Sequence, residues 1–257
     1  MIELTNIEKT FGDNTVFKNV NLSFAEGSVT ALVGPSGGGK STLLRCINLL
    51  EIPTAGRLQI GQEALDFEPG KAVGWASIQR LRRQTGMVFQ SFQLFPHRTA
   101  VENVMEGLIT VLKWPKEKAR KRALELLEKV GLAQKADAWP ATLSGGQQQR
   151  VAIARALAPA PKVLLCDEPT SALDPELSGE VVEVLAQLAR EGTTMVIATH
   201  DLRLASKVAQ EAVFLDGGAV VEKGNAQELF STPKNPRTIR FIATITQKPA
   251  EQAGSGI

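Results

Sequence analysis

The 257-residue sequence has no tyrosine, only two cysteines and two histidines, and no long hydrophobic run. A helix that crosses a membrane needs about 20 consecutive apolar residues, and no segment here approaches that length. The first residues, Met1 to Leu4, include an acid and lack the basic and then apolar design of a signal peptide. We therefore expect a soluble protein that would reach a membrane only through a partner.

The cysteines and the charge balance argue against two further classes of protein. Cys46 and Cys166 lie in apolar stretches, which favours buried, reduced thiols over a disulfide and so favours the cytosol. The chain carries 29 Lys and Arg against 27 Asp and Glu, a net charge of +2. Domains that bind nucleic acid usually carry a strong basic excess, so we expect no nucleic-acid partner. The local basic cluster at residues 80–83 is interpreted as a solvated face.

The spacing of apolar residues predicts an α/β fold. Residues 2–24 alternate with period two, which is typical of antiparallel strands. The apolar runs at 28–33, 163–166 and 195–199 indicate buried parallel strands. Helical spacing, as in residues 176–190, separates these runs. We therefore predict a mostly parallel sheet covered on both faces, with an N-terminal antiparallel β layer.

The middle of the chain is mainly helical and is expected to form an inserted subdomain. Residues 116–131 have the pattern of an amphipathic helix that stops at a glycine. A hairpin is predicted at 213–221, around Asp-Gly-Gly. The predicted organisation is an α/β core of residues 1–90 and 162–245, a helical subdomain of residues 91–161, and a loose C-terminal tail of residues 246–257.

Residues 34–42 fit the P-loop pattern of a nucleotide-binding protein. Glycines let successive backbone N–H groups point at a phosphate, and the following helix adds its positive N-terminal end. Lys40 supplies a charge for the outer phosphates, and the Ser41 hydroxyl can ligate Mg²⁺. A buried strand before the motif and a helix after it provide the required context. The predicted nucleotide contacts are Gly34, Pro35, Ser36, Gly37, Gly38, Gly39, Lys40, Ser41 and Thr42.

Two acids end the apolar run at 163–166. Asp167 can hold Mg²⁺ through water, opposite Ser41. Glu168 is placed to polarise a water aimed at the γ-phosphate. Acids also end buried strands simply because the chain enters solvent there. The P-loop earlier in the chain is what favours a role in nucleotide hydrolysis for this pair.

Two further polar residues follow predicted strands at the same edge of the sheet. His200 comes after 195–199, where α/β sheets bind ligands, and we expect it to contact the γ-phosphate. Gln90 follows 87–89, and its amide can reach the metal or the attacking water. Each indication is weak by itself. The predicted catalytic residues are Glu168, His200 and Gln90, and the predicted metal-binding residues are Ser41, Gln90 and Asp167.

A second glycine-containing turn, Leu-Ser-Gly-Gly-Gln at residues 143–147, precedes a helix expected over 148–157. A helix N-terminus of this kind can bind an anion, although serine is also a common N-cap residue. Because one nucleotide already has the P-loop, a second such turn suits the nucleotide of another copy. We predict a head-to-tail homodimer that sandwiches two nucleotides, with contacts from Ser144, Gly145, Gly146 and Gln147.

The ordered set of motifs resembles the ABC ATPases over nearly the whole chain. Residues 143–147 match their LSGGQ signature, and Gln90, residues 171–174 and His200 match the Q-loop, D-loop and switch histidine. The resemblance implies an ATPase with ATP and Mg²⁺ as cofactors, built on a P-loop NTPase core. ATP would lie between the P-loop of one subunit and the signature of the other.

The resemblance also implies nucleotide contacts from Phe11, Val16 and Asp174. Phe11 stands where many members have a tyrosine that stacks on adenine. Phenylalanine keeps an aromatic face, so we expect adenine binding to survive this change. Gly38 stands where serine is common, which we expect to leave the phosphate-binding loop intact.

A finer resemblance is to importer ATPases for polar amino acids, at residues 89–97, 171–180, 214–224 and 235–241. It implies a peripheral subunit on the cytoplasmic face of the inner membrane, with integral permease subunits as partners and a solute-binding protein as an indirect one. It also places residues 90–97 beside the groove that receives the permease. The apolar side chains in that stretch are equally explained as core.

Three alternative functions compete with this one. The chain could serve an importer of another solute or an exporter. It could be a soluble ABC ATPase that acts on DNA or ribosomes, but it has neither a heptad run nor a second P-loop. A P-loop GTPase or kinase has no use for LSGGQ, and no Asn-Lys-x-Asp guanine-binding motif is present.

Overall fold

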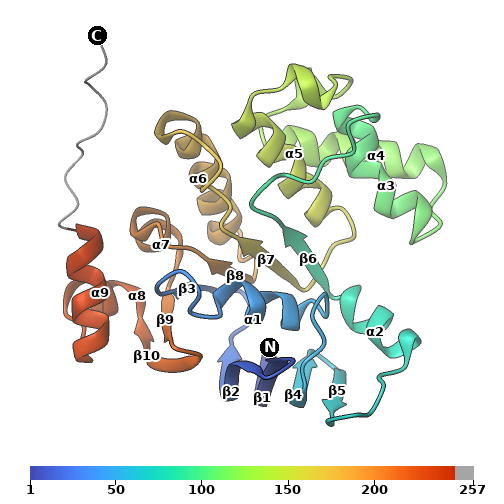
Figure 1. The fold of residues 1–257 in the computed structure, drawn as a ribbon. Helices are drawn as coiled ribbons and strands as arrows, with labels where there is room; N and C mark the ends of the chain where they lie inside the picture. Colours follow the sequence, from blue (N-terminus) through green and yellow to red (C-terminus); the bar gives the residue numbers. More distant parts are fainter. Residues whose placement is uncertain (247–257) are drawn as a thin grey trace.

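The computed structural model describes residues 1–246 and has the α/β architecture shown in Figure 1. The central sheet has six strands in the order β10-β9-β3-β8-β7-β6, and only the β9–β10 pair is antiparallel. Its strands are β3 (Val29–Val33), β6 (Thr85–Val88), β7 (Val163–Asp167), β8 (Met195–Ala198), β9 (Glu211–Asp216) and β10 (Ala219–Asn225). The predicted fold class is confirmed.

A separate four-stranded antiparallel sheet is built mainly from the beginning of the chain. Its order is β2-β1-β4-β5, with β1 (Ile2–Phe11), β2 (Asn14–Phe24), β4 (Ala55–Ile60) and β5 (Glu63–Phe67). The alternation predicted for residues 2–24 is visible as buried Ile2, Leu4 and Ile7 on one face of β1. That face packs against the first helix and the central sheet in one apolar core.

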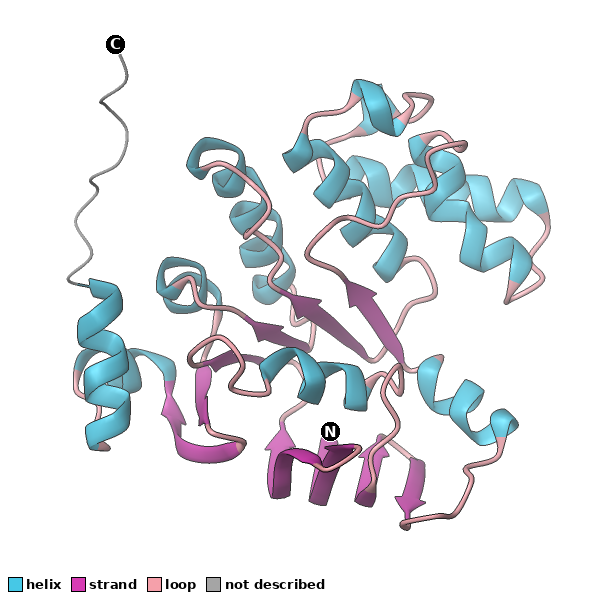
Figure 2. Ribbon diagram, in the orientation of Figure 1, coloured by secondary structure: helices cyan, strands magenta, loops and turns pink. Residues whose placement is uncertain are grey.

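Helices cover the central sheet and form a separate group in the middle of the chain (Figure 2). The helices are α1 (Lys40–Ile47), α2 (Trp75–Arg82), α3 (Ala100–Thr110), α4 (Lys116–Lys129), α5 (Gly145–Leu157), α6 (Pro175–Arg190), α7 (Leu202–Val208), α8 (Ala226–Ser231) and α9 (Pro236–Thr246). Short 3₁₀ turns occupy Ala133–Lys135 and Pro140–Thr142. Because α3, α4 and α5 pack on one another, they share a core of small and aliphatic residues with α6 and with the ends of the nearby strands.

Two boundaries differ from expectation. The helix expected over 148–157 begins three residues earlier, at Gly145, because Ser144 caps it from inside the motif. Thr246, the first residue of the predicted tail, is the last residue of α9. The rest of the predicted tail, residues 247–257, lies outside the described residues.

The parallel strands fix where a ligand site can form. Strands β3, β8, β7 and β6 run in the same direction, so their carboxyl ends meet at one edge of the sheet. This edge carries the P-loop, Asp167 as the last residue of β7, Glu168 directly after it, the histidine after β8 and the glutamine after β6. This is the edge at which open α/β sheets bind ligands.

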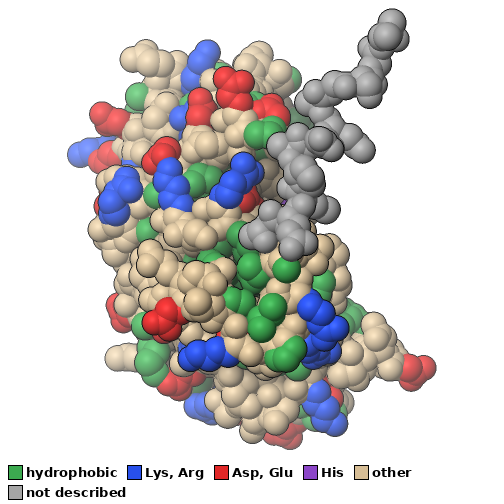
Figure 3. Space-filling model, turned by 90° about the vertical axis from the view of Figure 1, so that its left-hand side faces the viewer, with side chains coloured by type: hydrophobic (Ala, Val, Ile, Leu, Met, Phe, Trp, Pro, Cys, Tyr) green, Lys and Arg blue, Asp and Glu red, His purple; other side chains and the backbone are tan. Residues whose placement is uncertain are grey.

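The surface and the helices give two further observations. The face that carries α9 shows basic and acidic side chains interspersed around apolar ones (Figure 3). Among residues 1–246, no helix combines the length and the apolar character that crossing a bilayer demands.

Candidate functional site

The P-loop is a tight turn that joins β3 to α1. Gly34 needs to be glycine because a Cβ there would lie 2.0 Å from the carbonyl oxygen of Leu215, and its φ is +148°. Gly39 ends the turn in the left-handed region, at φ +94°, immediately before α1 begins. The loop therefore closes against β9 and leaves Ser36 and Gly37 exposed at its tip.

Lys40 points back into this loop. Its Nζ donates to the carbonyl oxygens of Gly34, at 2.8 Å, and Pro35, at 2.9 Å. The side chain is buried, and burial lowers the pKa of Lys40, while the nearby charges of Glu168 and Asp167 act in the opposite direction. A cation is thus held within the loop, beside the backbone that would surround a phosphate.

Ser41 and Asp167 meet across the edge of the sheet. The Ser41 hydroxyl donates to Oδ1 of Asp167 at 2.5 Å, and Arg45 lies 3.4 Å from Oδ2. Asp167 is buried. A hydroxyl and a carboxylate side by side are hard oxygen ligands of the kind that Mg²⁺ prefers. The residues present therefore fit a magnesium ion.

Glu168 and His200 form a second pair at the same edge. His200 Nδ1 lies 2.9 Å from Oε2 of Glu168. Glu168 has a φ of +48°, a left-handed conformation that few non-glycine residues adopt. Its backbone N–H donates to Ala198 at 2.8 Å, which ties this turn to the end of β8. Strained backbone of this kind is concentrated at functional sites.

Gln90 follows β6 at the same edge. The pairing of β6 with β7 ends at Val88 and Cys166, so Gln90 and Glu168 each lie two residues beyond the last pair. The Gln90 side chain is exposed and makes no hydrogen bond within the part of the chain that the structure describes. It is therefore free to turn toward a ligand.

The signature turn lies elsewhere. Ser144 and Gln147 form a capping box at the start of α5: the Ser144 hydroxyl accepts from the Gln147 N–H, and the Gln147 side chain accepts from the Ser144 N–H. A Cβ on Gly145 would lie 2.9 Å from Leu173, and one on Gly146 would lie 3.2 Å from the Leu177 oxygen. Figure 1 shows α5 in the helical group, apart from α1. One chain therefore does not bring its signature turn to its own P-loop.

Comparison with known proteins decides the family. A family model described as "ABC transporter" matches residues 17–171. The chain belongs to the ABC transporter family. The L-cystine import ATP-binding protein TcyC of Bacillus subtilis is 54% identical over 245 residues, covering 95% of this chain and 98% of that protein. The glutamine transport ATP-binding protein GlnQ of Escherichia coli is 51% identical over 246 residues, covering 96% and 100%.

Solved structures similar to this chain are also ABC cassettes. The dimeric post-hydrolysis state of the ATP-binding cassette MJ0796, bound to ADP and Pi, has a TM-score of 0.75 and 38% identity and covers 88% of this chain and 99% of that chain. Cassettes of the ABC family thus bind nucleotide and form dimers. This chain is an ATP-binding subunit of that family, an ATPase that drives transport.

Three further candidate residues of this ABC ATPase are placed differently from one another. Phe11 ends β1 with its ring exposed, and Lys9 Nζ lies 4.3 Å from the ring centroid. Val16 lies beside the P-loop, since a Cβ on Gly39 would be 3.5 Å from its Cγ1. Asp174 caps α6 by accepting from the Leu177 N–H at 2.9 Å.

Two residues of the site were not singled out from the sequence. Arg45, beside Asp167, follows Ser41 by four residues in α1, and this helical spacing could have indicated a shared face. Gln149, one helical turn beyond the N-terminus of α5, donates to the backbone carbonyls of Phe89, just after β6, and Pro169, just after β7. No local pattern in the sequence indicates that contact.

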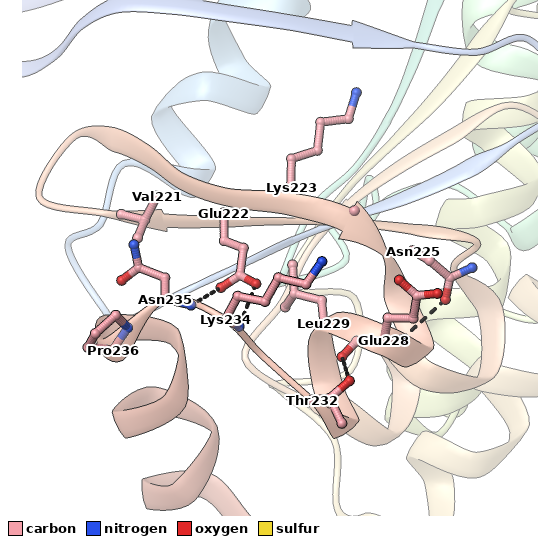
Figure 4. A pocket seen from close by; sticks show the side chains of 11 residues that line it. Val221, Glu222, Lys223, Asn225, Glu228, Leu229, Thr232, Lys234, Asn235 and Pro236 are labelled. Atoms are coloured by element: carbon pink, nitrogen blue, oxygen red, sulfur yellow. Dashed lines mark hydrogen bonds between the residues drawn. The ribbon is translucent and has the colours of Figure 1, made fainter.

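A cavity of about 380 Å³ lies away from the P-loop, between β10, α8 and the start of α9 (Figure 4). At its wall the Glu222 carboxylate accepts from the N–H groups of Lys234, at 2.9 Å, and Asn235, at 3.0 Å. These contacts anchor the start of α9 to the sheet. We assign the cavity no part in nucleotide binding.

Proposed function

We propose that this ABC ATPase powers the import of polar amino acids, from the cytoplasmic face of the inner membrane, through separate permease subunits that receive solute from a binding protein. The support is that relatives at 50–54% identity, over at least 94% of this chain, are named for the transport of L-cystine, glutamine and arginine. A transporter of another solute is the alternative, because the solute does not meet this subunit.

In the proposed mechanism, ATP lies with its phosphates in the loop of residues 34–42. Lys40, which donates to the Gly34 and Pro35 carbonyls, then exchanges these bonds for the outer phosphate oxygens, since an ammonium bonds more strongly to an anionic acceptor than to a neutral one. Ser41 and Asp167, with Gln90, would hold Mg²⁺, which when bound neutralises charge on the phosphates. Phe11 and Val16 would flank the base.

Hydrolysis is assigned to the pair at the edge of the sheet. Glu168 accepts a hydrogen bond from the attacking water and takes its proton. His200 holds the Glu168 carboxylate in place through the 2.9 Å contact and is exposed enough to reach the γ-phosphate. Gln90 comes from the next strand and orients the same water. No covalent intermediate is needed, because positioning and charge stabilisation account for catalysis of phosphoryl transfer.

The proposed site is completed by a second copy in a head-to-tail dimer. One observation carries this part of the proposal: the residues that would hold the phosphates gather at one edge of the sheet, whereas the signature turn of the same chain starts α5 in the helical group. Ser144, Gly145, Gly146 and Gln147 would cover the γ-phosphate of the partner's ATP with a helix N-terminus. Asp174, at the start of α6, directly follows Leu173, which lies close to Gly145 of the signature turn.

The test is a mixing experiment with two inactive variants. Lys40→Ala removes the phosphate-binding cation, and Ser144→Asp puts a negative charge in the signature turn while keeping a good N-cap residue. Each variant alone should lose ATPase activity. A random mixture should recover roughly a quarter of wild-type activity, because half of the dimers then contain one complete site. Asn225→Asp, which adds the same charge at the N-cap of α8, is the matched control and should stay active.

No recovery in a mixture that forms mixed dimers would refute the composite site.

The solute is tested separately, by reconstituting the chain with its permease and binding protein in vesicles. Stimulation of ATPase activity by cystine, glutamine or arginine supports the proposal. Stimulation by an unrelated solute alone would replace it with the alternative.

A further inference from the structure

Gln149 is a fully buried polar residue to which the mechanism above assigns no role. It lies in the second turn of α5, five residues after the cap Ser144, and its exposed fraction is 0%. Its Nε2 donates to two backbone carbonyl oxygens, that of Phe89 at 3.2 Å and that of Pro169 at 2.9 Å. Phe89 immediately precedes Gln90, and Pro169 immediately follows Glu168. One side-chain amide therefore holds the backbone next to two of the proposed hydrolytic residues.

The orientation of this amide is determined by its neighbours. Both partners are carbonyl oxygens, which only accept, so the nitrogen must face them. The amide oxygen is then left without a donor among residues 1–246, although it is buried. A buried acceptor without a partner is unfavourable, and an apolar side chain of the same length would avoid it. The feature that distinguishes glutamine here is the pair of bonds from its nitrogen.

The position of these bonds explains what they do. Strands β6 and β7 pair up to Val88 and Cys166 and then separate. Beyond that last pair, the amide of Gln149 contacts the backbone of both chain segments and so sets their spacing. On the far side of Gln90, Arg155 of the same helix donates to the carbonyls of Phe92 and Gln93. The segment that contains Gln90 is thus fastened to α5 at both ends.

We propose that Gln149 is a positioning residue that fastens the signature helix to the backbone carrying Gln90 and Glu168. This proposal rests on the function proposed above and links the partner's nucleotide to the hydrolytic residues of this subunit. The N-terminus of α5 faces the partner's nucleotide in the composite site, whereas Gln149 contacts this subunit's own hydrolytic edge. A movement of α5 when the partner's ATP binds would therefore reach both Gln90 and Glu168 through one side chain.

The experiment compares Gln149→Met with Gln187→Met in the full-length chain. Methionine matches glutamine in length and removes both donors and the unpaired oxygen, so the fold should be retained. Gln187 is exposed on α6, and its substitution is the matched control. We expect Gln149→Met to lower kcat for ATP hydrolysis by about tenfold or more, because small displacements of reacting groups are costly. The KM for ATP should stay within about twofold, since the residues of the P-loop are untouched.

Each outcome is decisive. A kcat for Gln149→Met equal to that of wild type, or a loss that matches a lower folded fraction in a thermal melt, would overturn the proposal. If Gln149→Met does not fold, Gln149→Leu replaces it, because this more compact apolar side chain also removes the two amide donors and buries no charge; the same kcat and KM criterion applies. Failure of both to fold would assign Gln149 to stability alone. An inactive wild type would instead count against the proposed function.

Discussion

His200 Nδ1 lies 2.9 Å from Oε2 of Glu168, so the two side chains are in direct contact. The carboxylate is largely buried, with 14% of its side chain exposed, whereas the imidazole is 63% exposed. The glutamate is therefore held in one position by its backbone and by the histidine. The histidine keeps the freedom to meet a ligand on its open side.

The first prediction concerns Glu168→Gln. Glutamine keeps the size of the side chain and can still contact His200, but it cannot take a proton from water. We expect ATP binding to be retained and hydrolysis to fall by roughly 10²–10⁴-fold, the usual contribution of a general base. The variant should also accumulate as an ATP-bound dimer, measured by light scattering. Hydrolysis at the wild-type rate would remove Glu168 from its proposed role.

The second prediction concerns Lys40→Ala. The Lys40 ammonium is buried and is surrounded by acceptors, so its loss removes charge-assisted bonds to the outer phosphates. Bonds of this kind correspond to about 10–100-fold in affinity. ATP titration by calorimetry measures the change. Lys129→Ala is the control and should bind ATP normally. Lys129 lies on α4 of the helical group, where it forms an ion pair with Glu191. Equal affinities for the two variants would contradict the P-loop assignment.

Much of this molecule follows from local sequence. The period-two pattern located β1 and β2, the buried runs located β3, β7 and β8, and the residues after those runs gather at one edge because the strands are parallel. The P-loop pattern predicted a tight turn, and Gly34, Gly37 and Gly39 have positive φ values there, which residues with side chains rarely adopt. Local patterns could therefore predict which residues gather at one edge of the sheet.

The contacts within the site could not be predicted in this way. The left-handed backbone of Glu168 depends on its bond to Ala198, which is distant in sequence. The bonds of Gln149 depend on how α5 packs against two strand ends. Asp174, expected at the nucleotide, has its carboxylate engaged as the cap of α6. The backbone of Glu168 and the bonds of Gln149 depend on tertiary packing, which spacing along the chain does not encode, whereas the cap of Asp174 is a contact with a residue only three positions along the chain.

The third prediction compares two glycines of the P-loop. A Cβ at position 34 would lie 2.0 Å from the Leu215 oxygen, whereas one at position 37 would meet nothing within 4 Å. Gly37→Ala should cost about 1–2 kcal/mol, for its left-handed φ of +78° alone. Gly34→Ala should cost more, because the loop must also move away from β9. Urea denaturation measures both, and an equal or reversed order would contradict the packing of the loop against Leu215.

The fourth prediction uses the two cysteines, Cys46 and Cys166, which are both buried and unbonded. Burial raises the pKa of Cys46 to about 12 and raises that of Cys166 as well. Because the thiolate is the reactive form, neither should react with a maleimide at pH 8 while the chain is folded. In denaturant, both should react, and mass spectrometry should then count two labels per chain.

The same shift has a consequence for stability. The neutral thiol of Cys46 is favoured in the folded state, so the folded chain binds more protons than the unfolded one between pH 9 and about 12. The contribution of this group to stability is therefore complete below pH 9 and is lost as the pH rises toward 12. Cys46→Ala should show a shallower decline of urea midpoint between pH 8.5 and 10 than wild type does. Parallel declines would mean that the thiol titrates alike in the folded and unfolded chains. In the labelling experiment, rapid reaction of Cys46 in the native protein would mean that α1 opens readily.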